Sequence, residues 1–123
     1  MTTGAISAGA IAGALLRFWL QRWLNISALT PLGTLLANLS GAFLLGLVLP
    51  LISSTAHPNW FALLTAGFCG SFTTFSALTM ELFEMARVQA WTRAALYSFG
   101  TLGLGLICFI GGYYLGTWLS GKA

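Results

Sequence analysis

The side chains that could do chemistry in this chain are mostly uncharged and lie inside long apolar stretches. Asn38 is one of them, in the middle of the segment GTLLANLSG (residues 33–41). Its amide offers two hydrogen-bond donors and one acceptor. An unpaired polar group in hydrocarbon costs free energy. Asn38 therefore either bonds to a neighbouring helix or contacts a solute that crosses the membrane.

A second polar run, GFCGSFTTFS, occupies residues 67–76 of the third apolar stretch. Gly67 and Gly70 are three residues apart, and each glycine costs about 1 kcal/mol relative to alanine inside a helix. We expect the helix to break here and to free backbone carbonyls, which are hard ligands suited to a small cation. The alternative is a continuous helix in which Ser and Thr bond to carbonyls one turn earlier.

Phe72 and Phe75 flank the threonines of this run. Residues three apart share one face of a helix, and the edge of an aromatic ring is the positive end of its quadrupole. Two ring edges beside hydroxyl and amide donors would suit an anion without any full positive charge. The ordinary alternative is that both rings face lipid or neighbouring helices.

The fourth apolar stretch adds Tyr97 and Thr101, one helical turn apart, with Ser98 beside them. These hydroxyls either form a ladder of donors or bond to their own backbone. Cys69 and Cys108 lie in apolar segments, where we expect them to pack rather than to form a disulfide or a metal site.

The composition places these groups in lipid. The 123 residues carry a net charge of +3, with 58% hydrophobic residues, 6% charged residues and a mean hydropathy of +0.88. Soluble domains have roughly 25% charged residues, so a water-soluble globule is excluded, and disordered chains lack such apolar mass. The few basic residues form no clustered stripe, so we expect no nucleic-acid partner.

Four helices of about 20 apolar residues can be laid along the chain. We expect an all-α integral membrane protein with one domain, residues 1–123, and helices at about 3–24, 31–54, 60–85 and 91–119. All five tryptophans fall at the ends of these helices, as in an aromatic belt. Small residues spaced by four, as in Gly9-Gly13 and Gly112-Gly116, would let the helices approach closely.

The orientation in the membrane is weakly specified. Arg22, Arg87 and Arg93 fall on one side and Lys122 on the other, a small bias toward a cytoplasmic arginine side. Insertion in both orientations is therefore a real alternative. Four short helices are few to enclose a polar path, so we also expect an oligomer.

Three of these segments resemble the signature motifs of the Fluc (CrcB) fluoride channels. They are AGAIAGALLRF (residues 8–18), GTLLANLSGAFLLG (residues 33–46) and the polar run of residues 67–76. The resemblance covers essentially the whole chain, and Glu81 also fits the end of the third motif. It departs at Ala8, Phe18 and residues 77–79, where the family often has Gly, Tyr and Thr-Phe-Ser.

The resemblance implies passive, selective export of fluoride across a bacterial plasma (inner) membrane, relieving fluoride toxicity. It implies a multi-pass protein, a third helix broken near its middle, and an antiparallel, dual-topology homodimer with two pores. It also implies site residues. Asn38, Phe72, Phe75, Thr73, Tyr97 and Thr101 would line the fluoride path, Arg17 and Glu81 a vestibule, and the Gly67 and Gly70 carbonyls of both subunits would hold a structural sodium ion.

Neutral donors suit this task, because fluoride is strongly hydrated and fixed cations would hold it too tightly for conduction. A proton-coupled multidrug transporter of similar size is the first rival, but it needs a carboxylate in the membrane, and the first helix has none. The second rival is an assembly subunit, which would not explain the polar run. The sequence contains no nucleophile–base pair of the kind that would indicate an enzyme.

Overall fold

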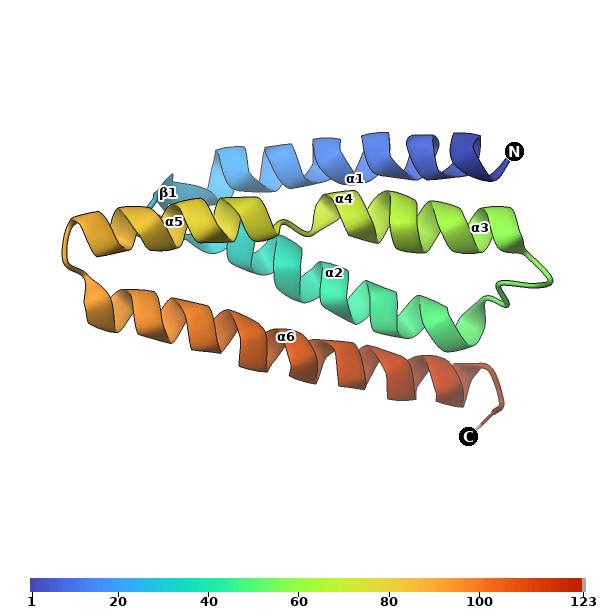
Figure 1. Cartoon of the computed structure of the whole chain (residues 1–123). Helices are drawn as coiled ribbons and strands as arrows, with labels where there is room; N and C mark the ends of the chain where they lie inside the picture. Colours follow the sequence, from blue (N-terminus) through green and yellow to red (C-terminus); the bar gives the residue numbers. More distant parts are fainter. Residues whose placement is uncertain (123) are drawn as a thin grey trace.

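Long apolar runs in the sequence fold into long helices. The computed structural model describes residues 1–122. It has four helical segments long and apolar enough to cross a membrane: α1 (Thr2–Leu24), α2 (Leu32–Leu51), a segment from Pro58 to Arg87, and α6 (Trp91–Leu119). They run side by side along one axis, with both chain ends at the same end of the molecule (Figure 1). The predicted all-α, four-helix membrane fold is confirmed.

The third segment is not one regular helix. It comprises α3 (Pro58–Ala62), the π-helical η1 (Leu63–Cys69), α4 (Gly70–Phe72) and α5 (Phe75–Arg87). Between α4 and α5 the backbone is extended, with ψ 153° at Thr73 and φ −147° at Thr74. The predicted break therefore exists, but it lies beyond the Gly67–Gly70 pair on which the prediction was based.

Packing explains why the glycines do not break the helix. Gly67 lies against Ile6 and Gly9 of α1. Because glycine has no side chain, the backbones of η1 and α1 can approach each other closely there. The break comes where Thr73 follows the end of α4 and Thr74 can begin α5. The Thr74 side chain accepts a hydrogen bond from the Ala77 amide, at 3.1 Å, as helix N-caps do.

Close helix contacts follow the small residues. On α1, a side chain on Gly9 or Gly13 would overlap the carbonyl oxygens of Leu63 or Phe68. On α6, one on Gly112 would overlap the carbonyl of Phe43. These positions join α1 to the first half of the third segment and α2 to α6 (Figure 1), as helix packing in lipid requires.

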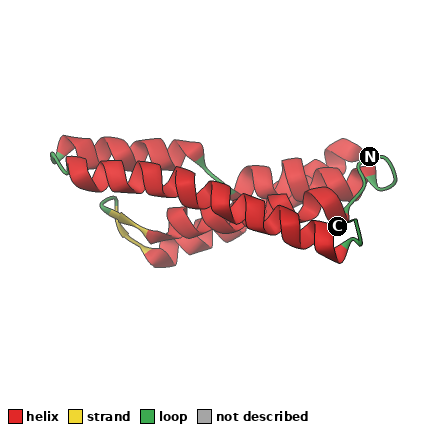
Figure 2. Cartoon of the chain, turned by 90° about the horizontal axis from the view of Figure 1, so that it is seen from below, coloured by secondary structure: helices red, strands yellow, loops and turns green. Residues whose placement is uncertain are grey.

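A short hairpin, which the sequence pattern does not predict, connects α1 to α2. The strands β1 (Asn25–Ser27) and β2 (Thr30–Pro31) pair antiparallel at the end of the molecule opposite the termini (Figure 2). The α5–α6 turn lies at this same end (Figure 1).

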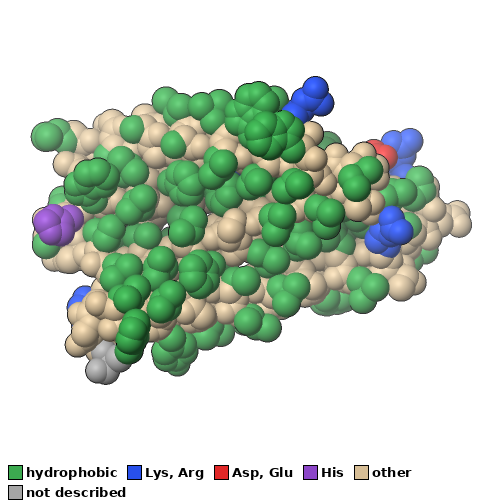
Figure 3. Space-filling model, turned by 180° about the vertical axis from the view of Figure 1, so that it is seen from behind, with side chains coloured by type: hydrophobic (Ala, Val, Ile, Leu, Met, Phe, Trp, Pro, Cys, Tyr) green, Lys and Arg blue, Asp and Glu red, His purple; other side chains and the backbone are tan. Residues whose placement is uncertain are grey.

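The surface is that of a membrane protein. Hydrophobic side chains cover the body of the molecule, while the visible Lys and Arg side chains lie mainly toward the end opposite the chain termini (Figure 3). Trp23, Trp60, Trp91 and Trp118 are exposed near helix ends, where an aromatic belt would meet the lipid headgroups.

Candidate functional site

The helix break is held by Asn38 of α2. The Asn38 side chain accepts a hydrogen bond from the Thr74 amide, at 2.7 Å, and donates one to the Thr74 carbonyl, at 3.2 Å. One amide thus satisfies both backbone groups of an extended residue at membrane depth, where unpaired groups are costly. Of the two interpretations left open for Asn38, the interhelical bond is present, and one N–H of the amide is left over.

Arg17 caps the other side of the break. Its Nε donates to the carbonyl of Ser71, at 2.9 Å, in the last turn of α4. A cation at a helix C-terminus is favourable because carbonyl groups there lack partners. The family resemblance implies that Arg17 lies near an aqueous vestibule, and that stays a prediction; the structure adds that its Nε is bonded to a backbone carbonyl.

Two hydroxyls of the polar run, those of Ser71 and Thr73, donate hydrogen bonds to backbone carbonyls. The Thr73 hydroxyl donates to the Cys69 carbonyl, at 2.9 Å, and the Ser71 hydroxyl lies 2.9 Å from both the Gly67 and the Ala10 carbonyls. For these two residues the structure supports the backbone-bonded alternative.

A hollow of about 320 Å³ opens beside the break. Its lining includes Asn38, Thr73, Thr74, Phe75 and Thr101. Thr101 is 8% exposed, and its hydroxyl is the one buried side-chain polar atom without a hydrogen-bond partner among residues 1–122. A buried, unpaired hydroxyl costs about 1–3 kcal/mol, so this donor is free for a ligand.

The two phenylalanines do not share a face. Phe72 is 2% exposed and stacks on Phe68 at a centroid distance of 5.3 Å, whereas Phe75 is 77% exposed and lines the hollow. The helical spacing rule fails here because the break lies between them. Within one chain, only Phe75 reaches the hollow.

Glu81 lies in a buried hydrogen-bond network and does not face water. It is 3% exposed and accepts bonds from the Thr34 hydroxyl, at 2.6 Å, and the Tyr97 hydroxyl, at 2.7 Å. The family resemblance implies a vestibule position for Glu81, and that position stays a prediction; in the single chain these donors enclose the carboxylate. A buried carboxylate needs such donors, and these come from α2 and α6.

The sequence analysis missed two members of this network. The Asn25 side chain donates to Glu81 Oε1, at 3.4 Å, and accepts from the amides of Gly33 and Thr34, so it caps the start of α2 from the hairpin. Gln21 donates to the Thr34 hydroxyl, at 3.1 Å. One feature of the sequence could have indicated such a network, because an acidic residue inside a membrane span requires hydrogen-bond donors from other segments.

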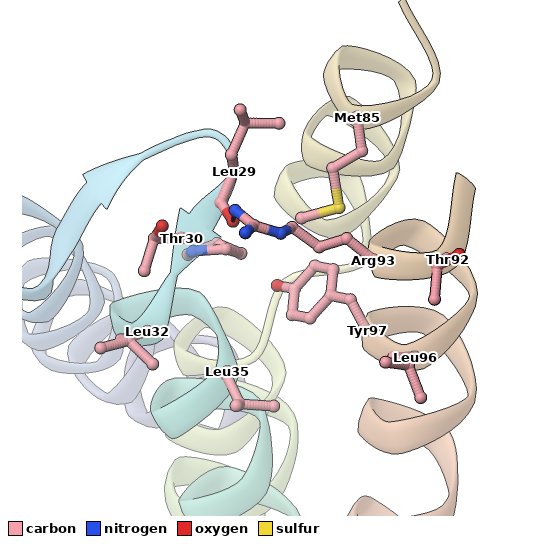
Figure 4. Close-up of a pocket in the computed structure, with 10 residues that line it drawn as sticks. Leu29, Thr30, Leu32, Leu35, Met85, Thr92, Arg93, Leu96 and Tyr97 are labelled. Atoms are coloured by element: carbon pink, nitrogen blue, oxygen red, sulfur yellow. Dashed lines mark hydrogen bonds between the residues drawn. The ribbon is translucent and has the colours of Figure 1, made fainter. Parts of the chain in front are cut away.

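A second, larger cavity of about 650 Å³ lies between the hairpin, the start of α2 and the start of α6 (Figure 4). Tyr97 lines this cavity, and Thr101, one turn further along α6, lines the smaller hollow. The two hydroxyls of the predicted ladder thus belong to residues that line two separate cavities. Its first hydroxyl bonds to Glu81, whereas its second is free.

The carbonyls predicted to hold sodium differ in their surroundings. No group of three or more His, Cys, Asp or Glu side chains in the described part of the chain is placed to hold a metal, which leaves backbone oxygens. Gly70 is exposed, and the Thr74 amide that would bond to its carbonyl in an unbroken helix bonds to Asn38 instead. The Gly67 carbonyl already accepts from Ser71, so Gly70 fits a cation better.

Comparison with known proteins gives consistent matches. Residues 4–113 match the family described as "CrcB-like protein, Camphor Resistance (CrcB)". The chain is 45% identical over 104 residues to "Fluoride-specific ion channel FluC 2" of Moorella thermoacetica, covering 83% of this chain and 85% of that protein. It is 36% identical over 119 residues to "Fluoride-specific ion channel FluC" of Chlorobium chlorochromatii, covering 94% and 92% of the two chains.

Proposed function

The chain belongs to the CrcB-like family, and we infer that it is, like the relatives it resembles, a fluoride-specific ion channel of a membrane and not an enzyme. We propose that it lets fluoride leave the cytoplasm passively across the bacterial inner membrane. Such export would lower the toxicity of fluoride to the cell.

The free hydroxyl of Thr101 is the observation that carries this proposal at the level of the site. It is buried, it lines a hollow at a helix break, and none of the residues lining that hollow is charged. An anion entering there must exchange its water for protein donors. The Thr101 hydroxyl, the spare N–H of Asn38 and the edge of the Phe75 ring are the groups at hand.

Conduction requires an ion to leave as readily as it binds. Neutral dipoles and ring edges attract an anion less strongly than a fixed cation would. We propose that fluoride passes along α6 between the two cavities, by way of Thr101 and Tyr97, with Thr73 and Phe72 as further members that rest on the family resemblance.

A second copy of the chain would complete the path. Phe75 is 77% exposed, and the hollow beside it is open. We propose an antiparallel, dual-topology homodimer in which the partner covers this face and two pores form. The weak charge bias of the sequence supports insertion in both orientations.

We also propose that a structural sodium ion lies between the subunits, held by backbone carbonyls of Gly70 and, less directly, Gly67. The ion would offset part of the cost of moving an anion through the protein. Fluoride efflux from vesicles prepared without sodium should then fall, and added sodium should restore it. Equal efflux in both preparations would remove sodium from the proposal.

Efflux from liposomes tests the function directly. Vesicles with the pure protein should release fluoride far faster than bare vesicles and should retain chloride. Phe75→Ile, which removes the ring edge from the hollow, should slow fluoride efflux about tenfold, the effect of losing about 1.4 kcal/mol of interaction, whereas Phe83→Ile, at another exposed position of α5, serves as the control. Release no faster than from bare lipid would refute the proposal.

A further inference from the structure

Arg93 extends the row of polar side chains formed by Tyr97 and Thr101 toward the start of α6. Arg93, Tyr97 and Thr101 are spaced by four residues, so they follow one face of the helix over two turns. Arg93 and Tyr97 line the larger cavity, and Thr101 lines the hollow at the helix break. We propose that Arg93 is the anion-recruiting group at the mouth of the pathway; this inference rests on the proposed function.

The position of the guanidinium supports this role. Arg93 Nη1 donates to the Leu29 carbonyl of the hairpin, at 3.0 Å. Figure 4 shows the side chain extending across the cavity between Leu29 and Tyr97. A guanidinium has five N–H donors, so this single bond fixes its place and leaves the others for water or an arriving anion.

The charges nearby give Arg93 a specific task. It is the one charged residue among those lining the larger cavity. Beyond the residues that line the cavity, the Tyr97 hydroxyl donates a hydrogen bond to the Glu81 carboxylate. The negative charge of that carboxylate repels an approaching anion. The positive charge of Arg93 opposes this repulsion at the place where the path meets water, and its exposure keeps it from holding the anion tightly.

The other arginines at this end of the molecule do not fit the role. Arg87 is paired with Glu84, with N–O distances of 3.0 and 3.2 Å. Arg22 is exposed in the last turn of α1 and lines none of the cavities described here. Removing Arg22 changes the net charge by the same amount without touching the cavity, so it makes a matched control.

Single-channel recording in planar bilayers tests the proposal. Fluoride current is measured at an ionic strength of about 10 mM and again with sodium gluconate added to about 300 mM, which shortens the Debye length from about 30 Å to well under 10 Å. A unit charge at about 8 Å in water changes the local anion concentration about twofold. Arg93→Gln should therefore lower the current about twofold in dilute salt and much less in concentrated salt.

The comparison variants decide between explanations. Arg93→Lys should conduct like the wild type, because it keeps the charge, and Arg22→Gln should stay close to the wild type. Three results would overturn the inference: an unchanged current in Arg93→Gln, an equal loss in Arg22→Gln, or a loss that persists in concentrated salt and in Arg93→Lys. Absence of fluoride current in the wild type would instead refute the proposed function.

Discussion

At the scale of single residues, one side chain can hold the fold and still serve the path. Asn38 appeared from the sequence as either a helix-to-helix bond or a pathway group. The structure shows that its oxygen and one N–H satisfy the backbone of Thr74. The second N–H is left over, so the break in the helix and the donor beside it depend on the same amide.

Thr101 allows the two roles of a polar residue to be separated. Thr101→Val keeps the shape of the side chain and removes a hydroxyl that bonds to nothing in the described chain. We expect stability to stay the same or rise by about 1 kcal/mol, because a buried unpaired group is lost, while fluoride efflux falls. Melting in detergent and efflux from liposomes measure the two effects.

The control for this change is Thr117→Val, which removes a hydroxyl that bonds to the Tyr113 carbonyl and lies outside both cavities. It should leave efflux unchanged. If Thr101→Val lowers stability and leaves efflux intact, the hydroxyl is structural and the pathway does not use it.

At the scale of elements, the hairpin is more than a connection between α1 and α2. Asn25 in β1 supplies the cap that Pro31 cannot give to the start of α2, and it also reaches Glu81 on α5. Asn38 lies on α2, about one turn beyond the capped residue Thr34. The hairpin therefore helps to set the position of the helix that holds the break.

Asn25→Ala should lower stability by about 2 kcal/mol, because it leaves two helix amides and a buried carboxylate with fewer partners. Ser27→Ala, in the same hairpin but with an exposed hydroxyl that accepts one hydrogen bond, from the Leu29 amide, should cost much less. Thermal melting of both purified variants in detergent measures the difference. Equal melting temperatures would show that the cap adds nothing.

Neighbouring glycines on α6 test how the helices pack. Gly112→Ala would place a methyl group against the Phe43 carbonyl, whereas Gly111→Ala would meet nothing within 4 Å. We expect the first to cost about 1–3 kcal/mol by forcing α2 and α6 apart. The second should be neutral or slightly stabilising. Similar melting of the two proteins would contradict close α2–α6 packing.

At the scale of the whole molecule, the sequence sufficed wherever one strong rule acted alone. Apolar length gave four spans, and glycine spacing gave their close contacts. The position of the break could not be derived, because it depends on Thr74 pairing with Asn38 from another helix. The burial of Glu81 and the different exposure of Phe72 and Phe75 follow from tertiary contacts that no local pattern contains.

The orientation of the chain in the membrane gives the last prediction. If the chain inserts both ways, a cysteine at either end should be accessible from each side of the membrane in about half of the molecules. Val88→Cys, in the exposed α5–α6 turn, and His57→Cys, at the opposite end, provide such sites. They are labelled separately with a membrane-impermeant thiol reagent, before and after permeabilisation of the membrane, in a background with Cys69 and Cys108 replaced by alanine.

Each site should show about half of its labelling before permeabilisation, because the weak arginine bias does not fix one orientation. Complete labelling of one site and none of the other would show a single orientation, and the antiparallel dimer could not form.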